Sequence, residues 1–198
     1  MDWIAARWII LICIGLLPQI VCASGFSYQI DIKTKLIINQ KKTLTHLLMT
    51  WTYDHATSAL LLDGGDLSTP ALKKFSLTAI ADEIMRDLAK KHYFTELSFD
   101  QRAVYFAKAS HYKLRLLANQ RLQLRFKLPL KSQYQLKGRH YLQFRHYDPK
   151  GNAILYYPNP NKLHLPLRLA HYCKKEIQPL RKTKLGQIQQ AILRCRVP

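Results

Sequence analysis

The chain has 198 residues and carries 31 Lys and Arg against 12 Asp and Glu, a formal net charge of +19. That length fits one domain with a core of its own, and the charge favours polyanionic partners such as anionic lipid headgroups. The sequence contains neither a glycine-rich phosphate loop nor a Gly-x-Ser-x-Gly nucleophile elbow, and its carboxylates are few. We therefore expect a protein that binds its partner rather than an enzyme.

The N-terminal segment is typical of a secretory signal peptide. An apolar run, Trp8–Leu17, precedes Val21 and Ala23, which occupy the two positions that a signal peptidase reads. We predict cleavage that makes residues 1–23 the signal peptide and residues 24–198 a single periplasmic domain. The alternative is an N-terminal membrane anchor, because no charged residue interrupts the stretch from the apolar run to the first predicted strand.

Residues of alternating polarity predict a series of strands after the signal. In residues 27–38, Ile30 and Ile32 alternate with polar neighbours, as in a half-buried strand. The clearest hairpin turns at Asn119-Gln120, and Pro129 is expected to end its second strand. The predicted strands cover residues 27–38, 44–53, 94–99, 112–116, 122–128, 139–147, 153–157 and 163–169.

Helical spacing of apolar residues is found in two places. The main helix is predicted over about residues 70–91, where Ile80, Ile84 and Leu88 form a stripe behind a cap at Ser68 or Thr69. A short C-terminal helix is predicted over residues 185–193. The expected fold class is α+β, mainly an antiparallel β-sheet or sandwich with one main helix.

Cleavage of the signal would leave Cys173 and Cys195 as the cysteines of the mature chain. Two cysteines in an oxidising compartment predict one disulfide. The alternative is a pair of buried free thiols.

Few side chains are placed to form a metal site. Asp54-His55 is the best-placed pair, because it follows a predicted strand and precedes a loop. The Asp63–Ser68 loop has too few oxygen ligands for calcium and is expected to be a turn that caps the helix.

Basic residues alternate with apolar ones along several predicted strands, giving those strands one basic face. An anion-binding surface is one hypothesis, and an ordinary solvated sheet face is the other. Export would make nucleic acid an unlikely partner for such a surface. The candidate anion-binding residues are Lys113, Arg115, Arg121, Arg125, Arg139 and Arg145.

Several motifs together resemble a family of unknown function. They are Met49–Ala59, His92–Glu96, Leu124–Leu130, Tyr147–Pro149 and the stretches around Cys173 and Cys195. Members of that family are often labelled as the periplasmic component of an uncharacterised ABC-type transport system. They tend to be encoded beside nickel/cobalt-type permeases. The resemblance implies export, one α+β domain and an accessory role in divalent-metal handling.

The resemblance also suggests metal ligands for nickel, cobalt or zinc. Asp31 and Asp54 match the family pattern, and His55 would assist them. However, Gly25–Ser27 stands where members carry a His-Pro-His stretch, which removes two imidazole ligands. The leading hypothesis is a periplasmic accessory or binding protein of a metal-transport system, with an inner-membrane permease as partner and a degraded metal site. The alternative is a basic envelope protein that binds an anionic polymer or membrane surface.

Overall fold

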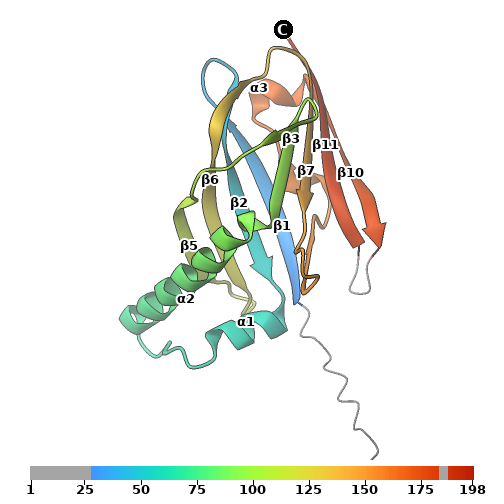
Figure 1. The fold of residues 1–198 in the computed structure, drawn as a ribbon. Helices are drawn as coiled ribbons and strands as arrows, with labels where there is room; N and C mark the ends of the chain where they lie inside the picture. The colour runs from blue at the N-terminus through green and yellow to red at the C-terminus, as the bar shows by residue number, and fades with distance from the viewer. Residues whose placement is uncertain (1–27, 183–186) are drawn as a thin grey trace, which may run out of the picture.

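The computed structural model describes residues 28–182 and 187–198. The predicted signal peptide, residues 1–23, lies outside the described residues. The fold is α+β: two β-sheets share one hydrophobic core, and the helices stand beside the sheets (Figure 1).

The first sheet, sheet A, holds the N-terminal strands. Its order is β5 (Ser110–Leu116), β6 (Leu122–Gln135), β2 (Thr43–Tyr53), β1 (Tyr28–Ile38) and β8 (Ala153–Tyr156), with the short β9 (Leu163–His164) also pairing with β1. Strand β1 runs antiparallel to β2 but parallel to β8 and β9. The N-terminal strand is therefore paired on both sides.

The second sheet, sheet B, holds the C-terminal strands and is antiparallel throughout. Its order is β10 (Cys173–Lys182), β11 (Gln187–Val197), β7 (Gly138–His146), β3 (Thr95–Phe99) and β4 (Arg102–Val104). Strand β11 lies between β10 and β7, and the side chains of its Ala191, Ile192 and Leu193 are all buried.

The predicted main helix is confirmed as α2 (Pro70–Lys90). Thr69 caps it by accepting a hydrogen bond from the Leu72 N–H at 3.2 Å, and Pro70 fits the first turn. The other helices in the described part are all shorter. They are the α-helices α1 (His55–Leu62) and α3 (Leu167–Ala170) and the 3-10 helices η1 (His92–Phe94) and η2 (Pro160–Lys162). No helix among the described residues has the length and apolarity needed to cross a membrane.

The strand alternation places the core as expected. In β6, Leu122, Leu124 and Phe126 are fully buried, while the intervening polar side chains face outward. Trp51 packs edge-on against Phe126, with ring centroids 5.3 Å apart. The inner faces of both sheets contribute to one core cluster.

The predicted C-terminal helix over residues 185–193 is wrong from residue 187 on, while residues 185–186 lie outside the described residues. Residues 187–193 belong to β11, which pairs with β10 on one side and β7 on the other. The apolar residues Ile188, Ala191 and Ile192 have helical spacing, which explains the error. Pairing on both sides satisfies every backbone group of a central strand, and this tertiary context outweighs a local pattern.

Other elements also differ from the prediction. Strand β6 continues past Pro129 to Gln135, because the β2–β6 register shifts between Leu44 and His46 and a proline is tolerated at such a bulge. The predicted strand 163–169 contains only β9, and the chain then turns into α3. Helix α1 was not predicted.

The turn η1 has an unusual backbone. His92, Tyr93 and Phe94 have φ angles of 49°, 56° and 46°, in the left-handed region that L-residues rarely occupy. The contacts of the buried Tyr93 and Phe94 side chains compensate for this backbone strain. The Tyr93 hydroxyl accepts a hydrogen bond from the Ala109 N–H at 2.9 Å, and the Phe94 ring stacks on Trp51.

Candidate functional site

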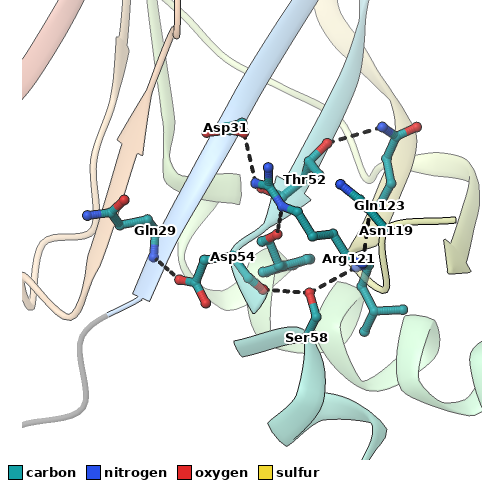
Figure 2. Close-up of polar contacts among 10 residues, drawn as sticks. Gln29, Asp31, Thr52, Asp54, Ser58, Asn119, Arg121 and Gln123 are labelled. Atoms are coloured by element: carbon teal, nitrogen blue, oxygen red, sulfur yellow. Dashed lines mark hydrogen bonds and ion pairs between the residues drawn. The ribbon is translucent and has the colours of Figure 1, made fainter. Parts of the chain in front are cut away.

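Arg121 links three strands at one end of sheet A (Figure 2). It stands just before β6, and its Nη2 lies 2.8 Å from Asp31 Oδ2 on β1, ninety residues away in sequence. Its Nε and Nη2 also donate to the backbone carbonyls of Tyr53 (2.6 Å) and Thr52 (3.2 Å) on β2. The guanidinium therefore joins the ends of β1, β2 and β6.

Asp54 forms the start of α1. Its Oδ1 accepts a hydrogen bond from the Thr57 N–H at 2.7 Å, which caps the helix, and its Oδ2 accepts one from the Gln29 N–H at 2.6 Å. Partial burial by itself would raise the pKa of Asp54. The hydrogen bonds from Gln29 and Thr57 and the nearby Arg121 charge outweigh burial and hold that pKa below its usual value.

Ser58 connects this cap to the next strand. Its hydroxyl donates a hydrogen bond to the backbone carbonyl of Asp54 at 2.6 Å (Figure 2). The same hydroxyl accepts a hydrogen bond at 2.9 Å from the N–H of Leu122, which is the first residue of β6. Asp54, a good N-cap residue directly after the predicted strand, is the local signal for α1 that sequence reasoning missed.

Asp31 has a second partner in Tyr156 on β8. A hydrogen bond to Asp31, followed by burial, raises the pKa of Tyr156 to about 12. The Asp31 carboxylate thus ties β1 to β8 through the phenol as well as to β6 through Arg121.

The predicted metal ligands are not assembled into a ligating cluster. Asp31 is bonded to Arg121 and Tyr156, Asp54 is bonded to two backbone N–H groups, and His55 is exposed at the start of α1. Within the described ranges, no group of three or more His, Cys, Asp or Glu side chains lies close enough to hold a metal ion. The Arg121 charge would also repel a cation. The residues described here do not fit a nickel, cobalt or zinc site, and we derive no metal chemistry from them.

The outer face of sheet A carries a broad basic array. Lys113 on β5 is the direct register partner of Arg125 on β6, and Lys33 lies on the same row beyond Thr50 of β2. Arg115 is held by its hydrogen bonds to Gln123, at 2.7 and 3.0 Å. We call this surface the basic face; its residues are Lys33, Lys35, Lys113, Arg115, Arg125 and Lys127.

The remaining predicted anion-binding residues lie elsewhere. Arg121 is paired with Asp31. Arg139 and Arg145 lie on β7 in sheet B, where Arg145 Nη1 is 3.9 Å from Glu96 Oε2. Sequence reasoning missed Lys33, Lys35 and Lys127, although the alternation of the predicted strands already placed them on the polar side.

Two histidines beside the basic face respond to its field. Burial, and then the charges of four lysines, lowers the pKa of His164, the register partner of Lys35. Burial and then Lys127 lower the pKa of His46 on β2. The four lysines around His164 are Lys33, Lys175, Lys35 and Lys162. The positive potential therefore extends from β5 to β9 across sheet A.

The predicted disulfide is confirmed. Cys173 and Cys195 are bonded and stand directly opposite each other in the β10–β11 pair. The bond joins the edge strand β10 to the central strand β11 of sheet B.

Residues 26–194 match the model of a family described as "Protein of unknown function (DUF1007)". The chain belongs to this family. The match extends from the residues before β1 into β11 of this DUF1007 protein and confirms the resemblance to an unknown-function family. The family's description names no transport role, so the link to nickel or cobalt transport stays a prediction.

The other comparisons add little to the DUF1007 match. A search of curated proteins gave no match. Among solved structures, the acetylcholine-binding protein type 1 of Biomphalaria glabrata is similar over 92% of each chain, with 9% identity and a TM-score of 0.41. So low a TM-score does not indicate a shared fold.

Proposed function

We propose that this DUF1007 protein is a basic envelope protein that binds an anionic membrane surface through the basic face. The observation that supports this most is the gathering of Lys33, Lys35 and Arg125 with their neighbours on one face of sheet A. Lys33, Lys35 and Arg125 are exposed, so their charge is available to a partner.

The shape of the array favours a planar partner. Strands of a sheet lie about 4.8 Å apart, so bases on β5, β6 and β1 form a two-dimensional set of charges rather than a groove. Lipid headgroups present phosphates in a plane, and each nearby Lys or Arg contributes about 1 kcal/mol to binding an anionic leaflet.

Little negative charge opposes this set. Asp31 is the single carboxylate on the outer-facing positions of the described strands β1, β2, β5 and β6. Arg121 already neutralises its charge. By contrast, sheet B carries mixed pairs such as Arg194–Glu176, with 2.9 Å between Nη1 and Oε2. The asymmetry between the sheets supports sheet A as the binding side.

Export of the protein is part of the proposal. A disulfide is consistent with an oxidising compartment such as the periplasm, where the outer leaflet of the inner membrane and the inner leaflet of the outer membrane are both within reach.

The test replaces three bases of the basic face. The triple variant Lys33→Gln, Lys35→Gln, Arg125→Gln should bind vesicles of phosphatidylglycerol and phosphatidylcholine about 100-fold more weakly than the wild type, because three contacts of about 1 kcal/mol each are lost. Vesicle co-sedimentation measures this, and wild-type binding should weaken steeply with added salt because salt screens exposed charges.

A matched variant separates the face from the net charge. Lys74→Gln, Arg86→Gln, Lys90→Gln removes the same charge from exposed positions on α2 and should bind nearly as well as the wild type. Equal weakening in both triple variants would refute a role for the basic face. Binding to an anionic polysaccharide but not to the vesicles would replace the membrane with a polymer partner.

The metal-accessory role implied by the resemblance stays a prediction with its own measurement. If it holds, native mass spectrometry of the full chain with added nickel, cobalt or zinc should detect one bound ion. A metal-free spectrum at every addition would contradict direct metal binding.

A further inference from the structure

A group of basic side chains surrounds the short strand β9 at the edge of sheet A. Lys35 on β1 is the register partner of His164 on β9, so the two side chains point to the same face of the sheet. Lys33 lies two residues earlier on β1 and therefore faces the same way. Lys162 stands two residues before His164, at the end of η2.

Sheet B supplies a fourth lysine. Lys175 on β10 reaches across to β9, where its Nζ lies 3.2 Å from the Leu163 carbonyl oxygen and 3.4 Å from Asn161 Oδ1. An ammonium group has three donors, so one remains for another acceptor. We call this group the β9 lysine cluster; its members are Lys33, Lys35, Lys162, Lys175 and His164.

The positive charge of the β9 lysine cluster is not balanced by carboxylates. Among the described residues, none of its four lysines forms an ion pair with Asp or Glu. Asp31, on the same face of β1 as Lys33, is already paired with Arg121. Burial lowers the pKa of His164 most, and the charges of all four lysines lower it further. An anion bound among these like charges would offset their repulsion.

We propose that the β9 lysine cluster is a binding site for a phosphate monoester group. Such a group carries a charge of about −1.5 to −2 at pH 7, and its three terminal oxygens accept hydrogen bonds. The cluster offers donors from β1, from β9 with the turn before it, and from β10. A phosphodiester has about half that charge, so its Coulomb attraction to the lysines is correspondingly weaker.

The site needs no membrane, although it shares Lys33 and Lys35 with the basic face. The phosphate group can belong to a soluble phosphate ester or to a lipid headgroup, since both present the same terminal oxygens. Phosphate binding here can therefore occur even if the basic face binds no membrane.

Glycerol 3-phosphate and dimethyl phosphate test the charge preference on the full chain. At about pH 7.5 the first is mainly a dianion and the second is a monoanion. In an NMR titration at constant ionic strength, glycerol 3-phosphate should shift the His164 ring resonances saturably. It should bind at least about tenfold more tightly than dimethyl phosphate, because each lysine attracts the second negative charge as well as the first. Bound glycerol 3-phosphate should also raise the pKa of His164, because an opposite charge favours the imidazolium.

Two double variants assign the binding to this cluster. Lys162→Gln, Lys175→Gln removes two charges beside His164 and should weaken glycerol 3-phosphate binding about tenfold or more. If loss of Lys175 disturbs β10, Lys162→Gln alone should still weaken binding about threefold or more. The matched control, Lys113→Gln, Lys127→Gln, removes the same charge from β5 and β6, at least three strand spacings or about 14 Å from β9. It should change the affinity less than about twofold, because salt screens charges at that distance.

Vesicle co-sedimentation identifies the source of the phosphate group. A preference for phosphatidic acid over phosphatidylglycerol, lost in Lys162→Gln, Lys175→Gln, would identify a lipid headgroup. Glycerol 3-phosphate binding without that preference would identify a soluble phosphate ester. The absence of both results, or equal weakening in the two double variants, would overturn the proposed site. Membrane binding by the basic face is judged separately, because phosphatidylglycerol vesicles contain no phosphate monoester.

Discussion

Lowering the pH from about 6.5 towards 3 should reduce the free energy of unfolding by up to about 5 kcal/mol. Burial lowers the pKa of His146 from the ordinary 6.5 to about 3. Between those values the unfolded chain takes up a proton that the folded chain refuses, so stability falls as the pH falls. The difference of about 3.5 pH units, at about 1.4 kcal/mol each, sets the upper limit.

His146 lies in a buried chain of hydrogen bonds that joins the two sheets. Its Nε2 is 2.8 Å from the Tyr157 hydroxyl, which in turn is 2.8 Å from Thr34 Oγ1 on β1. Its Nδ1 is 3.2 Å from Thr95 Oγ1 on β3. Among the described residues, no carboxylate takes part in this network of hydrogen bonds. No member of the network would therefore stabilise a charged imidazole.

The directions of these bonds require a neutral imidazole. The Thr95 hydroxyl donates to the Tyr93 carbonyl at 2.8 Å, so it must accept from His146 Nδ1–H. His146 Nε2 then accepts from Tyr157, and Tyr157 accepts from Thr34. A proton on Nε2 would make both ring nitrogens donors and would reverse the bond to Tyr157.

Urea unfolding at several pH values checks this prediction. The informative window is about pH 6.5 to about 4.5, because most carboxylates remain ionised there. His146→Gln should be less stable at pH 7 but should lose most of the slope in this window. A smaller slope should remain, because the pKa values of His46 and His164 are also lowered.

The control is His55→Gln, which alters an imidazole that is exposed at the start of α1. It should keep the wild-type slope. A wild-type protein whose stability does not change across the window would show that His146 takes up its proton without cost, contrary to its burial.

Removing the disulfide should lower the free energy of unfolding by about 3 kcal/mol. The bond closes a loop of 22 residues, and releasing that loop restores conformational entropy to the unfolded chain. Urea unfolding of Cys173→Ala, Cys195→Ala, compared with the oxidised wild type, measures the loss. The reduced wild type should match the double variant.

The loss should be largest along the edge strand. Strand β10 pairs with β11 alone, so without the bond its amides should exchange with deuterium much faster than those of β7 in the same sheet. Uniform exchange in both strands, or no change in stability, would mean that strand pairing alone holds β10.

Local patterns determined a large part of this fold. Alternation placed β1, β2, β5, β6 and β7 and told which side of each strand is buried, because a strand's side chains point to opposite faces in turn. The stripe ending at Leu88, with its Thr69 cap, located α2. The two cysteines of the predicted mature chain identified the disulfide pair.

Only the tertiary structure decided which of these faces come together. Residues 187–193 have a helical pattern but form β11, because β10 pairs with all of them and β7 pairs with them from Gln190 on. Asp31, singled out as a metal ligand, is bound instead by Arg121 from ninety residues away. Lys33 on β1 lies on the same surface as Lys113 on β5 and Arg125 on β6. This is so only because β2 pairs with β1 on one side and with β6 on the other. The polar and apolar faces of a strand can be predicted from its own residues. The order of the strands depends on pairing between segments that are distant in sequence, and a local pattern does not predict that pairing.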